Sequence, residues 1–147
     1  MSPRIPPDDP FIGRWLFDEA SAQYQLGTPP RDASYVITSD GERYTMTMRW
    51  TGSDDRTVEQ VYLAIPDGQS YAFEGSQGVD SFSMTRVDTH TLDTTARKDG
   101  EIVSHARRVL SDDSNTMTIT TDMHAPGGTH YTNLALYIRA HAAPDEG

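Results

Sequence analysis

The segment Phe11-Ile12-Gly13-Arg14-Trp15-Leu16-Phe17-Asp18 decides how the rest of the chain is interpreted. It contains a G-x-W step, Gly13 followed by Trp15, on the first stretch with a strand-like pattern. A glycine in a strand lets another backbone or a bulky ring approach closely. A tryptophan buries a large apolar area, and its indole N–H needs one hydrogen-bond partner. We therefore expect Trp15 to plug one end of a β-structure and to leave the other end free.

Almost everything after this segment has the pattern of short strands separated by turns. Residues 43–50 are the clearest example, because large apolar side chains alternate there with Arg and Thr. Asp99-Gly100 is typical of a two-residue hairpin turn. No segment has a convincing helical period. The pattern predicts strands over residues 10–18, 34–38, 43–50, 57–65, 70–74, 81–87, 91–98, 101–110, 115–123 and 129–139.

Regular short strands joined by tight turns favour an all-β fold, a single antiparallel up-and-down β-barrel of about 8–10 strands. Closing the meander removes its exposed edges. A two-sheet sandwich is the alternative, but it would show longer crossover connections. We expect a flexible leader over residues 1–9, the barrel over 10–140 and a flexible tail over 141–147. Residues 19–31 are expected to form a loop over one barrel mouth.

The composition narrows the classes of partner. The 147 residues include 22 acidic and 12 basic side chains, for a net charge of −10, so nucleic acid and anionic membranes are not expected as partners. The absence of cysteine excludes disulfides, thiolate catalysis and Cys-ligated metals. Neither a signal peptide nor a membrane-spanning run is recognisable. We expect a cytoplasmic protein that is a monomer or a homodimer.

Gly13 and Trp15, together with Tyr137-Ile138-Arg139, resemble the calycin superfamily, which includes the lipocalins and the fatty-acid-binding proteins. In lipocalins a basic residue late in the chain packs across the Trp of the G-x-W step, and Arg139 matches it in chain order. A guanidinium group can stack on an indole ring. The chain is most similar to a group of bacterial lipocalin-like domains, which share a basic pair in the antepenultimate strand, here Arg107-Arg108.

The resemblance implies a calycin-like barrel that binds a small hydrophobic molecule in its interior. The chain departs from the fatty-acid-binding pattern at Ala135, where we would expect a carboxylate-binding arginine two residues before Tyr137. It also has no clear helix–turn–helix lid after its first strand. A complete fatty-acid carboxylate clamp is therefore not expected.

The apolar strand faces provide the candidate binding residues. Met adapts to irregular ligands, and aromatic walls offer flat contact area. The alternative is that these side chains, together with Tyr44, Met117 and Ile119, only fill the core of the barrel. The candidate ligand-binding residues are Met46, Met48, Trp50, Tyr71, Phe73, Phe82, Met84, Arg107 and Asn133.

Which face of the late strands points inward is left open by the pattern. In residues 101–110 one face carries His105 and Arg107, and the other carries Ser104, Ala106 and Arg108. A shift of one residue in strand register exchanges the two faces. If the first face points inward, it offers polar groups to a ligand.

An enzyme on the same barrel is the alternative function, a cyclase or isomerase that acts by acid–base chemistry on an apolar, natural-product-like substrate. Its candidate catalytic residues are His105, Tyr131 and Glu59. None of the five histidines has a metal-ligand spacing, although His124 and His130 flank one hairpin turn. We therefore expect no metal and no other cofactor, with His105 as a lesser haem candidate through the resemblance.

Overall fold

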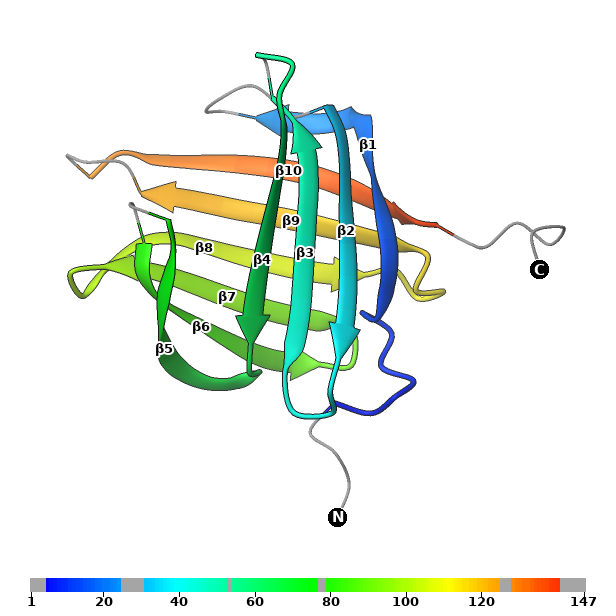
Figure 1. Cartoon of the computed structure of the whole chain (residues 1–147), viewed down its shortest axis with the longest axis horizontal. Coiled ribbons are helices and arrows are strands. Elements are labelled where there is room, and N and C mark those ends of the chain that lie inside the picture. The colour runs from blue at the N-terminus through cyan, green and yellow to red at the C-terminus, as the bar shows by residue number, and fades with distance from the viewer. Residues whose placement is uncertain (1–4, 25–30, 53, 77–78, 125–127, 141–147) are drawn as a thin grey trace, which may run out of the picture.

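The computed structural model describes residues 5–24, 31–52, 54–76, 79–124 and 128–140, except for the side chains of residues 73–76 (Figure 1). The ten predicted strands are confirmed. They are β1 (Gly13–Tyr24), β2 (Arg31–Ser39), β3 (Tyr44–Thr51), β4 (Thr57–Ala64), β5 (Asp67–Ser76), β6 (Val79–Asp88), β7 (Thr91–Lys98), β8 (Glu101–Leu110), β9 (Thr116–His124) and β10 (His130–Arg139).

All ten strands form one antiparallel sheet in the order β4-β3-β2-β1-β10-β9-β8-β7-β6-β5. The pairing of β1 with β10 joins the start of the chain to its end. Figure 1 shows the sheet curled on itself, with β2, β3 and β4 crossing in front of β6 to β10. Within the described residues no ladder joins β4 to β5. The expected barrel therefore has one open seam, and β4 and β5 remain edge strands.

The G-x-W step plugs one end of the barrel, as the sequence predicts. The Trp15 side chain is fully buried, and its indole N–H donates to the Phe11 carbonyl at 3.1 Å. The Arg139 guanidinium lies over the Trp15 ring, with Cζ 4.2 Å from the ring centroid. This guanidinium also donates to the carbonyls of Pro10, Ile12 and Ser114. Its partial burial lowers the pKa of Arg139.

Gly13 is required by this arrangement for two reasons. Its φ of +144° is a conformation that L side chains rarely adopt. A Cβ atom added at Gly13 would lie 2.5 Å from Nη1 of Arg139. The glycine of the G-x-W step therefore makes room for the arginine that covers the tryptophan.

The expected flexible leader instead packs into the core from Ile5 onward. The Ile5 side chain is 1% exposed, and its N–H donates to the Gly41 carbonyl at 2.8 Å. The carboxylate of Asp9 is buried and accepts hydrogen bonds from Tyr44 at 2.6 Å and from Arg86 at 2.7 Å. These contacts tie the segment across the plugged end. Residues 1–4 and the expected tail, 141–147, lie outside the described residues.

β1 is longer than predicted. It continues through Tyr24, where the sequence predicts a loop from residue 19, and its register with β10 shifts between Asp18 and Gln23. The Ser21 hydroxyl bridges the irregular part, because it donates to the Asp18 carbonyl at 2.5 Å and accepts from the Leu136 N–H at 3.0 Å. Residues 25–30 lie outside the described residues.

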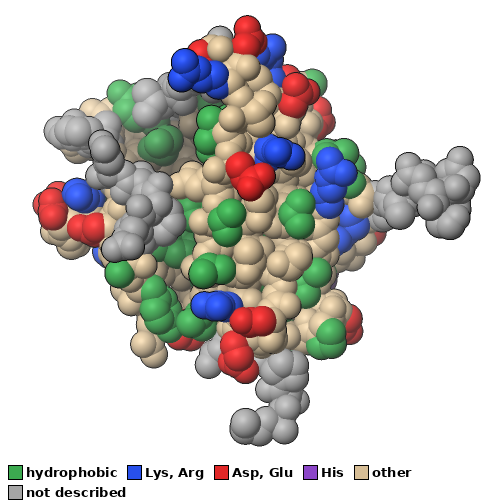
Figure 2. Space-filling view, in the orientation of Figure 1, with side chains coloured by type: hydrophobic (Ala, Val, Ile, Leu, Met, Phe, Trp, Pro, Cys, Tyr) green, Lys and Arg blue, Asp and Glu red, His purple; other side chains and the backbone are tan. Residues whose placement is uncertain are grey.

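The outer face of β2, β3 and β4 carries single apolar side chains among threonines and backbone (Figure 2). Val36 is 38% exposed, Val61 51% and Leu63 53%. Isolated apolar side chains of this kind are normal on protein surfaces. In the described part of the chain, no helix is long and apolar enough to cross a membrane.

Candidate ligand-binding site

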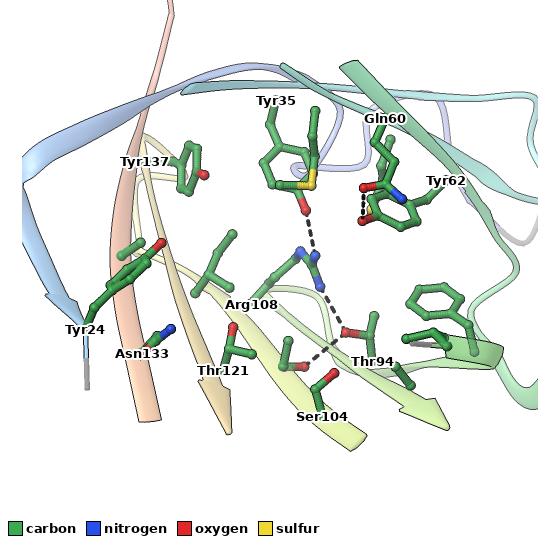
Figure 3. A pocket seen from close by; sticks show the side chains of 18 residues that line it. Tyr24, Tyr35, Gln60, Tyr62, Thr94, Ser104, Arg108, Thr121, Asn133 and Tyr137 are labelled. Atoms are coloured by element: carbon green, nitrogen blue, oxygen red, sulfur yellow. Dashed lines mark hydrogen bonds between the residues drawn. The ribbon is translucent and has the colours of Figure 1, made fainter. Parts of the chain in front are cut away.

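A cavity of about 330 Å³ lies inside the curled sheet, beyond the plugged end (Figure 3). Side chains from β1 to β4 and from β6 to β10 line it. The apolar part of the lining includes Met46, Met48, Phe82, Ile119 and Ala135. The polar part includes Arg108, Gln60, Thr94, Ser104, Thr121 and Asn133. The sequence-derived expectation of an apolar interior therefore holds for only part of the wall.

Arg108 is the charged group of this cavity. It is 8% exposed and projects from the inner face of β8. Its Nη1 donates to the Thr94 hydroxyl at 3.1 Å, and its Nη2 donates to the Tyr35 hydroxyl at 2.8 Å. Its Nε is buried and has no hydrogen-bond partner among the described residues. The ion pairs found among the described residues do not include Arg108.

An isolated buried charge is costly in free energy unless an opposite charge and hydrogen bonds compensate it. Two neutral hydroxyl partners leave the Arg108 guanidinium with hydrogen-bonding capacity for an anion. The cavity is therefore electrostatically suited to an acidic group beside an apolar surface.

Three tyrosines that line the cavity stay neutral over the physiological pH range. Burial raises the pKa of Tyr62 to about 12 and also raises the pKa values of Tyr24 and Tyr137. The Tyr62 hydroxyl donates to Gln60 Oε1 at 2.9 Å, and its ring stacks on Phe82 with centroids 6.2 Å apart. This stack joins the inner faces of β4 and β6 next to the open seam.

The structure places several predicted binding residues in or beside the cavity. Met46, Met48, Phe82 and Asn133 line it, and Met84 is buried in the adjoining core. They share the inner faces of β3, β6 and β10, which are the faces that the alternating pattern grouped together.

Two other predicted residues, Trp50 and Tyr71, are not part of the described cavity lining. Trp50 lies near the end of β3 and is only partly buried. Tyr71 lies on the edge strand β5, is 39% exposed, and donates its hydroxyl proton to the Asp67 carboxylate. The side chain of Phe73 lies outside the described residues.

Arg107 faces away from the cavity, contrary to the expectation that it meets the ligand. Its Nε and Nη2 donate to the Asp93 carboxylate at 2.7 and 2.8 Å on the outer face of the sheet. This hydrogen bonding holds the pKa of Asp93 below its usual range. The register of β8 turns Arg108 inward instead, so the second of the two faces left open by the sequence is the inner one.

The candidate catalytic residues are not brought together. His105 contacts Thr95 and Asp93 on the outer face. It lies opposite Asp122, which in turn lies opposite Thr132, so Tyr131 projects from the other face of the sheet. Glu59 also points outward, and its carboxylate lies 3.6 Å from Arg49 Nε. No acid–base pair of these residues faces the cavity.

His124 and His130 meet across the β9–β10 hairpin, as their spacing indicates. Their rings stack with centroids 4.1 Å apart. In the described part of the chain, no three His, Cys, Asp or Glu side chains are grouped so as to hold a metal ion.

The sequence interpretation missed Arg108 and Gln60 as site residues. Arg108 had a signal, since it belongs to the basic pair and lies on the alternative face of its strand. Gln60 had none, because a polar residue in the middle of a strand usually faces solvent.

The chain matches no protein-family model and no characterised protein by sequence. Its fold is similar to that of zebrafish ileal bile acid-binding protein complexed with cholic acid. The TM-score is 0.58 at 14% identity, over 89% of this chain and 99% of the other. It is also similar to a Schistosoma mansoni fatty acid binding protein in complex with arachidonic acid. There the TM-score is 0.59 at 15% identity, over 90% and 97% of the two chains.

Lobster apocrustacyanin A1 shares the fold more distantly. The TM-score is 0.50 at 13% identity, over 93% of this chain and 64% of the other. These likenesses show that the chain has the calycin-like fold that the sequence predicts. At such low sequence identity, these likenesses support the fold but do not identify a ligand.

Proposed function

We propose that this protein binds a small apolar molecule that carries an acidic group, with the apolar part inside the barrel and the acidic group at Arg108. The observation that carries this proposal is the buried guanidinium of Arg108, which has two neutral partners and one unpartnered N–H. The Met and aromatic side chains around it supply the apolar contact surface. Two proteins of the same fold are complexed with cholic acid and arachidonic acid, and each of these molecules joins a large hydrocarbon skeleton to a carboxylate.

Binding of an anion is favourable in this site because the anion supplies the opposite charge that the Arg108 guanidinium lacks. A charge-assisted hydrogen bond in a buried site contributes about 1.5–3 kcal/mol, which corresponds to roughly 10- to 150-fold in affinity. The Tyr35 and Thr94 hydroxyls hold the guanidinium in place before the ligand arrives. This preorganisation reduces the entropy lost on binding.

The test compares two neighbouring arginines with opposite orientations. Dodecanoate and dodecanol serve as competitors against the fluorescent probe anilinonaphthalene sulfonate, in the wild type, Arg108→Met and Arg107→Met. We expect Arg108→Met to weaken dodecanoate at least about 10-fold and to leave dodecanol unchanged. Arg107→Met is the control, since its guanidinium is paired with Asp93 on the outer face.

The unliganded stability of Arg108→Met separates a binding role from a structural one. Replacing a buried, incompletely paired charge by an apolar side chain of similar length is often neutral or stabilising. We therefore expect a melting temperature equal to or above that of the wild type. Equal loss of dodecanoate and dodecanol, or a large loss of stability, contradicts the proposal. The cytoplasmic location and the monomeric or homodimeric state stay predictions.

A further inference from the structure

The cavity has two chemically different walls. One wall belongs to β7 to β10 and presents the polar side chains of Thr94, Ser104, Thr121 and Asn133. Apolar side chains, Ile119 and several alanines, lie between them. In Figure 3 the four polar side chains lie side by side along one side of the cavity, below Arg108. The other wall belongs to β3, β4 and β6 and presents Met46, Met48, Tyr62 and Phe82, with Gln60 as a polar member that is bonded to Tyr62.

The polar wall follows directly from the strand register. Thr94 lies opposite Ala106, Ala106 opposite Thr121, and Thr121 opposite Asn133, so one row crosses four strands. Ser104 lies on the same face of β8, two residues from Ala106. Side chains of one cross-strand row are close neighbours. The row and Ser104 together form a polar strip of hydroxyl and amide groups, which Ala106 interrupts between Thr94 and Thr121.

Two hydroxyls of this strip are available to a ligand. The Thr94 hydroxyl is engaged, because it accepts from Arg108 and donates to the Ala106 carbonyl at 3.4 Å. Thr121 and Ser104 are only partly buried, and neither hydroxyl is hydrogen-bonded to another described residue. Each hydroxyl can donate one hydrogen bond and accept two.

The facing wall offers a different kind of contact. Met46 lies beside Tyr62 on adjacent strands, and Met48 lies beside Gln60. The Tyr62 hydroxyl is already bonded to Gln60, and the Tyr62 ring stacks on Phe82. Thioether and ring surfaces make dispersion and aromatic contacts and reject unsatisfied polar groups.

We infer that the preferred occupant is a rigid, facially amphipathic acid, with hydroxyl or carbonyl groups along one face and an apolar opposite face. A plain hydrocarbon chain would offer no hydrogen-bond partner to the Ser104 and Thr121 hydroxyls. A rigid polycyclic skeleton with polar groups on one face matches both walls at once. This inference rests on the proposed function, because the acidic group at Arg108 sets the direction in which the molecule lies.

The test uses two steroid acids that differ only in the groups on one face. Cholate carries hydroxyls that project from a single face, and cholanate has the same skeleton and carboxylate without them. Their affinities are measured by displacement of anilinonaphthalene sulfonate in the wild type, Thr121→Val, Ser104→Ala and Thr120→Val. Thr120→Val is the matched control, because Thr120 neighbours Thr121 on the outer face of β9.

We expect Thr121→Val and Ser104→Ala each to weaken cholate about three- to ten-fold, the effect of one neutral hydrogen bond. Cholanate should bind these variants as tightly as the wild type or more tightly, and Thr120→Val should change neither acid. Parallel changes for both acids, or no binding of either, overturn the inference. Dodecanoate that still binds with dependence on Arg108 then shows that the proposed function stands alone. If dodecanoate also fails to bind, both this inference and the proposed function are wrong.

Discussion

Replacing Arg139 by Met should destabilise the fold by about 3–4 kcal/mol. The guanidinium lies 4.2 Å from the Trp15 ring centroid, and a partly desolvated contact of this kind contributes about 1 kcal/mol. It also donates to the carbonyls of Ser114 and Ile12, both at 2.9 Å, and to that of Pro10. Each of these carbonyls would lose a charged donor, at about 1 kcal/mol apiece.

The assay is urea unfolding followed by tryptophan fluorescence, with circular dichroism as a second probe. A lower midpoint at unchanged slope measures the loss of stability. Arg139→Lys should lose nearly as much, because an ammonium group cannot reach three separate carbonyls from one planar fork. The control is Arg14→Met, since Arg14 is exposed on β1, and we expect a change within about 0.5 kcal/mol. A loss below about 1 kcal/mol in Arg139→Met refutes the reasoning.

Three further predictions test the same fold. Gly13→Ala should cost roughly 2 kcal/mol or more in urea unfolding, because of its φ of +144° and the close Arg139 Nη1; a neutral effect contradicts the close approach. Ile5→Ala should cost about 2–4 kcal/mol, whereas a mobile leader predicts no change. The pKa of Asp93 is lowered in the folded state. The contribution of the Asp93 carboxylate to the free energy of unfolding should therefore be fully present above about pH 4 and be lost as the pH falls further. The stability gap between wild type and Asp93→Asn should then close in acid, and a gap that is constant with pH contradicts it.

The strand pattern predicts most of this fold because most strands have a recognisable turn at both ends. Asp99-Gly100 separates β7 and β8, for example, and both strands have their predicted bounds. The contact between Trp15 and Arg139 is also predictable, because a guanidinium group near the end of the chain can stack on the indole ring of the first strand. The burial of Ile5 could not be predicted, since no local pattern distinguishes a short buried segment from a solvated one.

The site was harder to predict for a specific reason. In β8 both faces carry side chains that can be buried, and Val109 and Ile102 end up 39% and 41% exposed. The choice between Arg107 and Arg108 is made by the register with β7 and β9, which no local property of β8 determines. On β3 only one face is apolar, so the pattern identifies the inner face, which carries Met46 and Met48; their role in ligand binding stays a prediction.

Native mass spectrometry with an equimolar mixture of dodecanoate and dodecanol tests the central claim most directly. The wild type and Arg107→Met should retain one dodecanoate, because the acidic group completes the partners of Arg108. Arg108→Met should lose this preference and retain dodecanol at least as readily. A wild-type chain that retains neither molecule, or an Arg108→Met chain with an unchanged preference for dodecanoate, would contradict the account.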